Sequence, residues 1–197
     1  DLISYCRFIS ESPEKIKVME RLTNVPPSIL KCDAYAVIWF DSNKIGKISK
    51  CRGFNKNATN TSIHLGKGLA GSCAKNQCPI ILRNTADRHT VIFGTEEVKE
   101  PFLCLMAAPI AFNNQLYGAV VCGSKNAGSF SDLELNRLTL MAYSAASAMF
   151  CTRARERWAY NKNLDQITGI PNHRFLTEHR AALEKDLLKN GSPVSFL

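Results

Sequence analysis

The chain has 197 residues, of which 45% are hydrophobic and 21% are charged; these proportions are ordinary for a globular protein and exclude a disordered or collagen-like chain. The longest lean stretch, 138–151, is shorter than the roughly 18–20 apolar residues of a membrane helix, so we expect no membrane segment. A chain of this length holds one domain plus an extension, or two small domains.

The net charge of +8 is concentrated in the middle of the chain, where residues 44–100 hold ten basic and four acidic residues. A basic section can attract nucleic acid or another anion. Aromatic residues do not alternate with these basic residues, as a surface for stacking bases requires. We therefore interpret the section as a solvated face and predict no nucleic-acid partner.

The eight cysteines include no Cys-x-x-Cys pair, and several lie in apolar runs, as Cys104 does. This usage is typical of reduced cysteines that serve as small hydrophobic residues and predicts a cytoplasmic location. His64, His89, Cys73 and Cys78 have poor spacing for metal ligation. We therefore assign no metal site.

The N-terminal third predicts helix followed by strand. Apolar spacings of three and four over 2–24 indicate helix, with a fresh start at Ser12-Pro13 and an end at 25–27 (VPP). The apolar run 34–40 (AYAVIWF) predicts a central strand that is covered on both faces. After a turn, we expect a second strand over 45–54.

The middle of the chain is marked by glycines and by a long polar segment. Residues 64–71 (HLGKGLAG) predict a glycine-rich turn that leads into a short helix over 69–75, and a strand follows over 79–82. Residues 84–101 are polar and irregular. Long loops in compact domains are usually functional, so this loop is a candidate cover for a site.

The last part predicts a hairpin and a long helix. Apolar runs over 103–112 and 115–123 are joined by Asn113-Asn114, and two asparagines favour a tight turn. Ser131 and Glu134 have the spacing of a capping box, which opens a helix to about Asn163. The order of elements predicts an α+β fold with an antiparallel sheet.

One face of this long helix carries a heptad-like seam with small residues beside it, which would let another helix approach closely. The seam consists of Leu138, Met141, Ala145, Ala148 and Thr152. A turn over 168–172 and a last amphipathic helix follow.

Three segments of the chain, 65–82, 103–123 and 130–149, together resemble the GAF domain. That family shows a glycine turn, a strand that ends in proline, a glycine-containing strand and a long helix with a small polar cap. The residues that stand in those positions are Gly66, Gly68, Gly71, Pro79, Pro109, Gly118 and Phe130. The resemblance implies a sensory domain over 1–150, an α+β fold with a GAF-like antiparallel sheet flanked by helices.

Residues 165–174 (DQITGIPNHR) resemble the D-x-L-T-G-L-x-N-R-R signature that opens GGDEF domains, the diguanylate cyclases. His173 departs from the signature. The matching residues are Asp165, Thr168, Gly169, Asn172 and Arg174. In the family this segment braces the entrance of the catalytic domain, with the Asp and an Arg held together.

The second resemblance implies a linker helix over 151–164 and the start of a GGDEF domain over 165–197. The family's metal-binding acids and guanine-reading residues lie further downstream, so we assign no catalytic residue here. Mg and GTP are implied only for the rest of that domain. The chain begins at Asp1 and ends in a predicted strand over 194–197, so we expect it to be cut from a longer protein.

GAF domains usually hold a ligand between the sheet and the loops that cover it. The candidate wall residues are Trp39, Cys73, Arg83, His89, Phe93 and Cys104. Trp39 and the two cysteines are also explained by core packing, and Arg83 and His89 by exposure to water. The sequence does not identify the ligand.

The two resemblances together imply a cytoplasmic sensor. In this interpretation a small ligand or a redox change alters the pairing of helix 131–163 in a homodimer formed through 1–24 and 131–160. The helix then controls synthesis of cyclic di-GMP from GTP by a GGDEF domain.

Two alternatives stay open. The first is a GAF-fold enzyme that uses cysteine redox chemistry, as in the GAF family that reduces free methionine sulfoxide, although Leu69-Ala70 stands where that family places a cysteine. The second is a pure dimerisation module.

Overall fold

The computed structural model describes residues 2–11, 15–24, 26–54, 61–85, 90–94, 102–165 and 167–180. The chain divides into two units, Asp1–Phe150 and Cys151–Leu197. The long helix α5 (Asp132–Lys162) contributes residues to both units. The larger unit contains the sheet and all other labelled helices.

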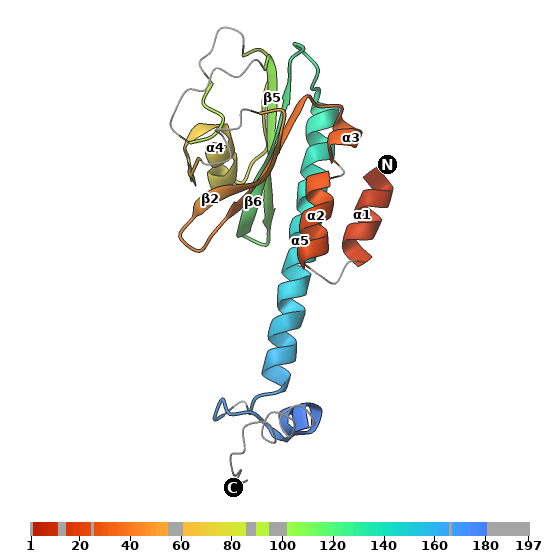
Figure 1. Cartoon of the computed structure of the whole chain (residues 1–197), viewed down its shortest axis with the longest axis vertical. Coiled ribbons are helices and arrows are strands. Elements are labelled where there is room, and N and C mark those ends of the chain that lie inside the picture. Colours follow the sequence, from red (N-terminus) through yellow and green to blue (C-terminus); the bar gives the residue numbers. More distant parts are fainter. Residues whose placement is uncertain are drawn as a thin grey trace, which may run out of the picture. The chain divides into compact units, whose positions relative to one another are not determined.

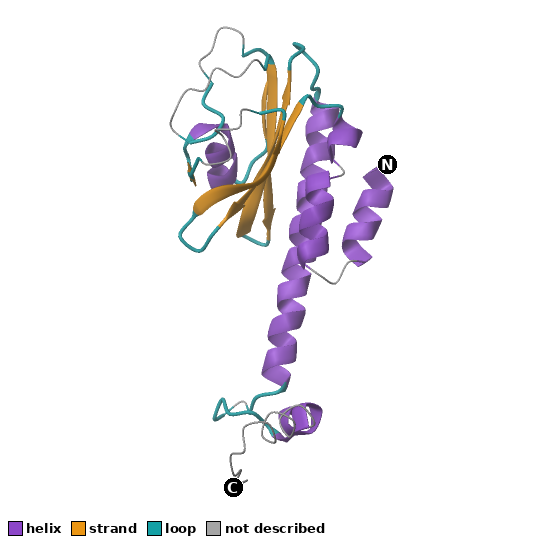
Figure 2. Cartoon of the chain, in the orientation of Figure 1, coloured by secondary structure: helices purple, strands orange, loops and turns teal. Residues whose placement is uncertain are grey.

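The N-terminal unit is built on a six-stranded antiparallel sheet in the order β3-β2-β1-β6-β5-β4 (Figure 2). Its strands are β1 (Ala34–Phe40), β2 (Ile45–Arg52), β3 (Ile63–His64), β4 (Ile80–Leu82), β5 (Cys104–Phe112) and β6 (Gln115–Ser124). Strand β1 lies between β2 and β6, which confirms the predicted central strand over 34–40. The α+β prediction is also confirmed.

Helices cover both faces of the sheet. One face carries α1 (Leu2–Glu11), α2 (Lys15–Asn24), α3 (Pro26–Leu30) and the first part of α5, and the other carries α4 (Gly68–Asn76) (Figure 1). Neighbouring residues of a strand point to opposite faces, so the sheet separates two hydrophobic cores.

The two cores take alternate residues of the same strands. The helix-side core contains strand residues Tyr35, Val37, Cys104, Met106 and Cys122 together with Tyr5, Leu22, Leu138 and Met141 of the helices. The α4-side core contains Ala36, Ile38, Leu105 and Val121 of the strands with Leu69, Cys73, Phe93 and Phe102. A strand that is buried on both faces reads as a continuous apolar run, which explains the composition of 34–40.

Two local predictions are confirmed in detail. Asn113 and Asn114 have φ angles of 50° and 59°, the left-handed conformation that a tight hairpin turn requires. At the start of α5, the Leu133 amide donates to Ser131 Oγ at 3.2 Å, and the Ser131 amide donates to Glu134 Oε2 at 3.0 Å. These reciprocal bonds form the expected capping box.

Two short elements were not predicted from the sequence. Pro26 follows the end of α2 but begins α3, because the fixed φ angle of proline suits the first turn of a helix. Strand β3 has two residues and pairs only with β2, so it leaves no periodic pattern to read. Ser12 and Pro13, the predicted fresh helix start, lie outside the described residues.

The predicted seam of α5 packs within its own unit. Leu138, Met141 and Ala145 are fully buried in the helix-side core and do not form a surface for a second helix. The large apolar side chains that α5 leaves exposed in this unit are Leu133, Leu140 and Tyr143, each more than half exposed. A helix from another chain would therefore meet a different face of α5 than the heptad pattern indicates.

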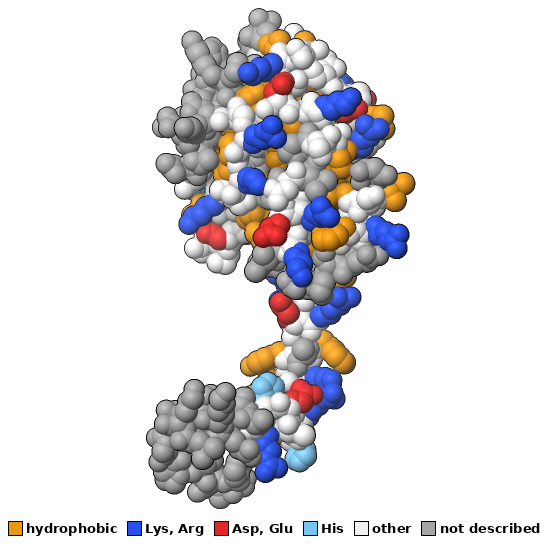
Figure 3. All heavy atoms as spheres, turned by 45° about the vertical axis from the view of Figure 1, so that its right-hand side comes forward, with side chains coloured by type: hydrophobic (Ala, Val, Ile, Leu, Met, Phe, Trp, Pro, Cys, Tyr) orange, Lys and Arg blue, Asp and Glu red, His pale blue; other side chains and the backbone are white. Residues whose placement is uncertain are grey.

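The surface of the N-terminal unit shows no gathered basic patch in the view of Figure 3, where Lys and Arg side chains are spread among uncharged and acidic ones. This arrangement agrees with a solvated basic face. Within the described ranges, every helix falls short of the length and apolarity needed to cross a bilayer.

Candidate functional site

The glycine-rich turn before α4 fastens a covering segment to the α4 side of the sheet. The amides of Leu69 and Ala70, in the first turn of α4, donate to the carbonyl oxygens of Val91 and Ile92 at 2.8 and 3.2 Å. The first amides of a helix often bind an anion. Here the backbone of the loop occupies two of them, so the turn holds the loop instead.

Glycine is needed at this junction because backbone segments meet there. Gly68 has a φ angle of +63°, and a Cβ at this position would lie 3.0 Å from the Ile92 oxygen. A Cβ on Gly71 would lie 2.2 Å from the His64 oxygen, too close for any side chain. Sequence analysis identified the glycines but not Val91 and Ile92, because backbone carbonyls leave no mark in the residue types.

An aromatic cluster lies beneath the covering segments on the α4 side. The ring centroid of Phe54 is 5.1 Å from that of Phe93 and 5.0 Å from that of Phe102, both in edge-on geometry. All three side chains are buried in the α4-side core. The position between sheet and covering segments is where we expected a ligand, and these rings form its apolar floor.

The predicted wall residues are divided between the two faces of the sheet. Cys73 and Phe93 lie in the α4-side core. Trp39 and Cys104 pack in or against the helix-side core, on the opposite face. The candidates therefore do not form one wall, and Cys73 and Phe93 remain together. His89 lies outside the described residues.

Arg83 is engaged in an ion pair at the edge of the sheet. Its Nη2 atom lies 2.6 Å from Oδ1 of Asp132, the first residue of α5. The two side chains are 53% and 81% exposed, so solvent screens the pair. This contact directs Arg83 toward the helix side, away from Cys73 and Phe93.

Cys73 has the environment of an unreactive thiol. Burial raises the pKa of Cys73 to about 12, with a smaller contribution from nearby Cys78. Because the thiolate is the nucleophilic form, Cys73 is protonated at neutral pH. The cysteine-enzyme alternative therefore finds no activated nucleophile at this position.

In the C-terminal unit, Asp165 organises the turn of the GGDEF-like signature. Its Oδ1 atom accepts hydrogen bonds from the amide and hydroxyl of Thr168, both at 2.8 Å, and from the Ile167 amide at 3.2 Å. These bonds, led by the Thr168 amide, hold the pKa of Asp165 below its usual value. Gly169 has a φ angle of +68° and donates its amide to the Asp165 carbonyl at 2.9 Å, which closes the turn.

Asn172 connects the end of α5 to the next helix, residues 173–180. Its Nδ2 atom donates to the carbonyl oxygens of Lys162 and Leu164 at 2.9 and 3.2 Å. Its Oδ1 atom accepts from the amides of Arg174 and Phe175 at 3.0 and 3.1 Å, as an N-cap residue does. One side chain thus fixes the carboxyl end of one helix and the amino end of another.

One implied contact differs from the family pattern. The resemblance implied an Asp held to an Arg, but Arg174 Nε donates to Glu178 Oε1 at 2.8 Å, one helical turn further on. Asp165 is occupied by Thr168 and Ile167 instead. Local partners satisfy both groups, because i,i+4 pairs on a helix form without long-range order.

Comparison with known families and structures gives consistent results. A sequence model described as "GAF domain" matches residues 18–149. No protein of curated function matches the sequence.

Solved structures match across most of their length, with identities that establish similarity of fold alone. The GAF domain of an Acinetobacter phosphoenolpyruvate-protein phosphotransferase is 18% identical, with 78% of this chain and 92% of that chain covered and a TM-score of 0.63. For free methionine-R-sulfoxide reductase from Neisseria meningitidis in complex with its substrate, the values are 11%, 78%, 89% and 0.63. For the GAF domain/HD domain protein from Geobacter sulfurreducens they are 16%, 76%, 98% and 0.59.

Proposed function

The chain belongs to the GAF domain family, and from this premise we propose that it is the sensory part of a diguanylate cyclase-type signalling protein. In this proposal residues 1–150 are the sensor, 151–164 are a linker helix and 165–197 begin a GGDEF domain. The sensor controls the synthesis of cyclic di-GMP from GTP through α5.

The observation that carries this proposal is the connection made by Asn172. The signature segment begins three residues after α5 ends at Lys162, and the Asn172 side chain bonds to carbonyls at the end of that helix. The same side chain caps the helix over 173–180. A displacement of α5 is therefore passed on to the segment that opens the output domain.

The sheet supplies the path from an input to α5. Side chains of β1 alternate between the two cores, so Ile38 packs on the α4 side and Val37 packs on the side of α5. A ligand held under the covering segment shifts α5 only if it binds one arrangement of the sheet more tightly than the other. We place that ligand beside Cys73 and Phe93.

We further propose that the protein acts as a homodimer through its helices. Leu133, Leu140 and Tyr143 of α5 and Ile3 of α1 are more than half exposed, and Ile3 is 78% exposed. Exposed apolar side chains on adjacent helices favour association with another apolar surface. Pairing of two chains also brings together two cyclase domains, as the joining of two GTP-derived nucleotides requires.

The output assignment is tested by the coding sequence beyond Leu197. We expect it to encode the GGDEF hairpin and its metal-binding acids, and we expect the product of the whole reading frame to convert GTP to cyclic di-GMP with Mg. A reading frame that continues into a different type of domain would refute the diguanylate cyclase assignment.

The dimer and the ligand are tested on the purified chain. Light scattering at high micromolar concentration should give twice the monomer mass, and a monomer would refute the dimer. Native mass spectrometry then separates two functions, because a co-purified small molecule supports a ligand sensor. A protein that dimerises but never carries a ligand supports the pure dimerisation module.

A further inference from the structure

Two cysteines that are 90 residues apart in the sequence meet on the helix side of the sheet. Cys122 lies in β6 and is completely buried in the helix-side core. Cys32 lies just before β1, packs against the same core and is partly exposed. All eight cysteines are free thiols in this structure.

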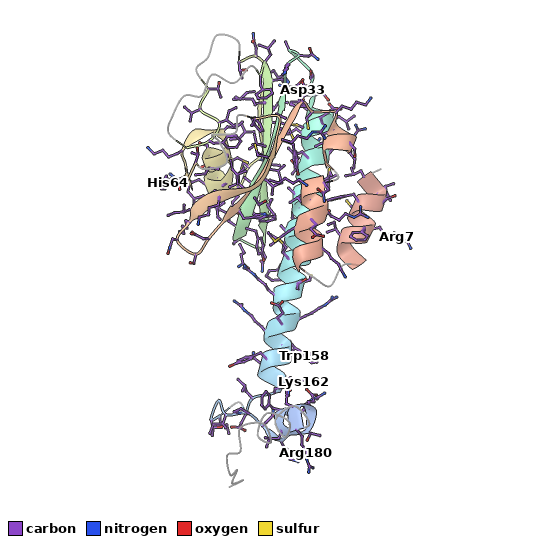
Figure 4. The ribbon with its side chains drawn as sticks, viewed as in Figure 1. Arg7, Asp33, His64, Trp158, Lys162 and Arg180 are labelled. Carbon is purple, nitrogen blue, oxygen red and sulfur yellow. The ribbon has the colours of Figure 1, made fainter. Side chains whose placement is uncertain are left out.

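Backbone contacts fix the residues beside both cysteines. The Asp33 amide donates to the Gly123 carbonyl at 3.0 Å. Asp33 Oδ2 accepts from Ser124 Oγ at 3.1 Å and from the Lys125 amide at 2.8 Å. Figure 4 shows Asp33 at the end of the sheet where β1 begins. The two sulfur atoms are thus held close together by the ladder itself.

The two thiols differ in character. Cys122 donates a hydrogen bond to the sulfur of Cys32, and this bond lowers the pKa of Cys32 with help from the charge of Arg52, against burial and the charge of Asp33. Burial raises the pKa of Cys122 well above its usual value. A reachable thiol that favours its thiolate therefore lies beside an enclosed thiol that stays protonated, the division of roles between an attacking and a resolving cysteine.

We propose that Cys32 and Cys122 form an oxidisable pair that reacts with a hydroperoxide and closes an intramolecular disulfide. The Cys32 thiolate attacks the outer peroxide oxygen, the O–O bond breaks, and the alkoxide or hydroxide that leaves takes up a proton. Cys32 is now a sulfenic acid. The Cys122 sulfur attacks the Cys32 sulfur, the S–O bond breaks, and water leaves with the thiol proton. The two thiols lose two electrons, and the hydroperoxide gains them.

The pair lies where the helix layer joins the sheet. Tyr35 stands opposite Cys122 in the β1–β6 ladder, and its hydroxyl donates to the Leu22 carbonyl in α2. A disulfide beside Tyr35 changes the packing against α2. Its use as the sensed input rests on the proposed function, whereas its formation does not.

The test treats the full chain with hydrogen peroxide and maps disulfides by peptide mass spectrometry. We expect a linked peptide pair containing Cys32 and Cys122, a mass decrease of about two hydrogen atoms and reversal by dithiothreitol. Cys32→Ser should abolish the link. The control Cys78→Ser, which removes an exposed thiol, should leave it unchanged.

A second measurement does not depend on a substitution in the core. Brief alkylation of the native chain should label Cys32 at least about tenfold faster than Cys122, and prior peroxide treatment should protect both. Oxidation that stops at Cys78 or Cys151 without a link between Cys32 and Cys122 would overturn the proposal. A link that forms while cyclic di-GMP synthesis by the whole reading frame does not respond would leave the disulfide site in place and remove its regulatory use.

Discussion

The amide nitrogen of Leu69 donates a hydrogen bond to the carbonyl oxygen of Val91 at 2.8 Å, and this contact fastens the covering segment to α4. Gly68 makes the approach feasible. We expect Gly68→Ala to destabilise the fold by about 1–3 kcal/mol, because an L residue at this φ angle is strained and its Cβ would press on the Ile92 carbonyl. Urea unfolding measures the loss.

Gly128 supplies a matched control for this prediction. Its φ angle is +70°, but no atom lies within 4 Å of the position its Cβ would take. Gly128→Ala should therefore show only the conformational cost, about 1 kcal/mol. Equal losses in the two variants would show that the contact with Ile92 carries no weight.

Cys73 and Cys78 should differ strongly in reactivity. Cys73 is buried with a pKa raised to about 12, whereas Cys78 is exposed. We expect native alkylation near neutral pH to label Cys78 at least about a hundredfold faster than Cys73. In urea the two rates should converge. Rapid labelling of Cys73 in the folded protein would revive the cysteine-enzyme alternative.

The Arg83–Asp132 ion pair should contribute little to stability. Both side chains are more than half exposed, so a double-mutant cycle with Arg83→Ala and Asp132→Ala should give a coupling below about 1 kcal/mol. The coupling should fall further as salt is added. A larger, salt-independent coupling would contradict the exposed geometry.

The capping box of α5 should make stability depend on pH. Hydrogen bonds from Ser131 hold the pKa of Glu134 below its usual value of 4.5. The carboxylate therefore stabilises the fold above that value, and the contribution is lost as the pH falls through the lowered pKa. Ser131→Ala should cost about 1 kcal/mol at neutral pH.

The acid range provides the check on this cap. The deficit of Ser131→Ala relative to the unchanged chain should shrink at about pH 3, where Glu134 takes up its proton. Ser131→Thr keeps the hydroxyl and should behave like serine. A deficit that is the same at both pH values would indicate that Glu134 has no part in the cap.

Two substitutions of Asn172 should separate its two contacts. Asn172→Ala removes the acceptor for the amides of Arg174 and Phe175, and we expect these amides to exchange hydrogen about tenfold faster. Asn172→Asp keeps that acceptor but loses the donor to Lys162 and Leu164. The Thr168 amide, bonded to Asp165, serves as the internal control. Unchanged exchange in Asn172→Ala would exclude the cap.

Elements with strong local signals were predicted almost to the residue. The strand over 34–40 is an apolar run between two aspartates, and it forms β1 with those bounds. The Asn113-Asn114 turn and the Ser131 cap are each specified by their own side chains. Local conformation and hydrogen bonding determine such features, so the sequence carries them directly.

The candidate site was predicted less well, for a physical reason. Alternation along a strand assigns residues to two faces but does not say which helix covers either face. Trp39 and Cys104 were therefore grouped with Cys73 and Phe93, although the sheet separates the two pairs. The helical periodicity of α5 likewise identified its apolar face, but not that the chain's own sheet covers that face.

The sequence by itself determined the class of fold, most of its elements and the glycine and proline pattern by which the family is known. It also set the Asp165–Arg174 signature, because turn and cap chemistry depends on neighbouring residues. Only the tertiary structure decided that Val91 closes the start of α4 and that Cys32 lies against Cys122. Those contacts join segments far apart in the chain, and they exist only once the strands have paired.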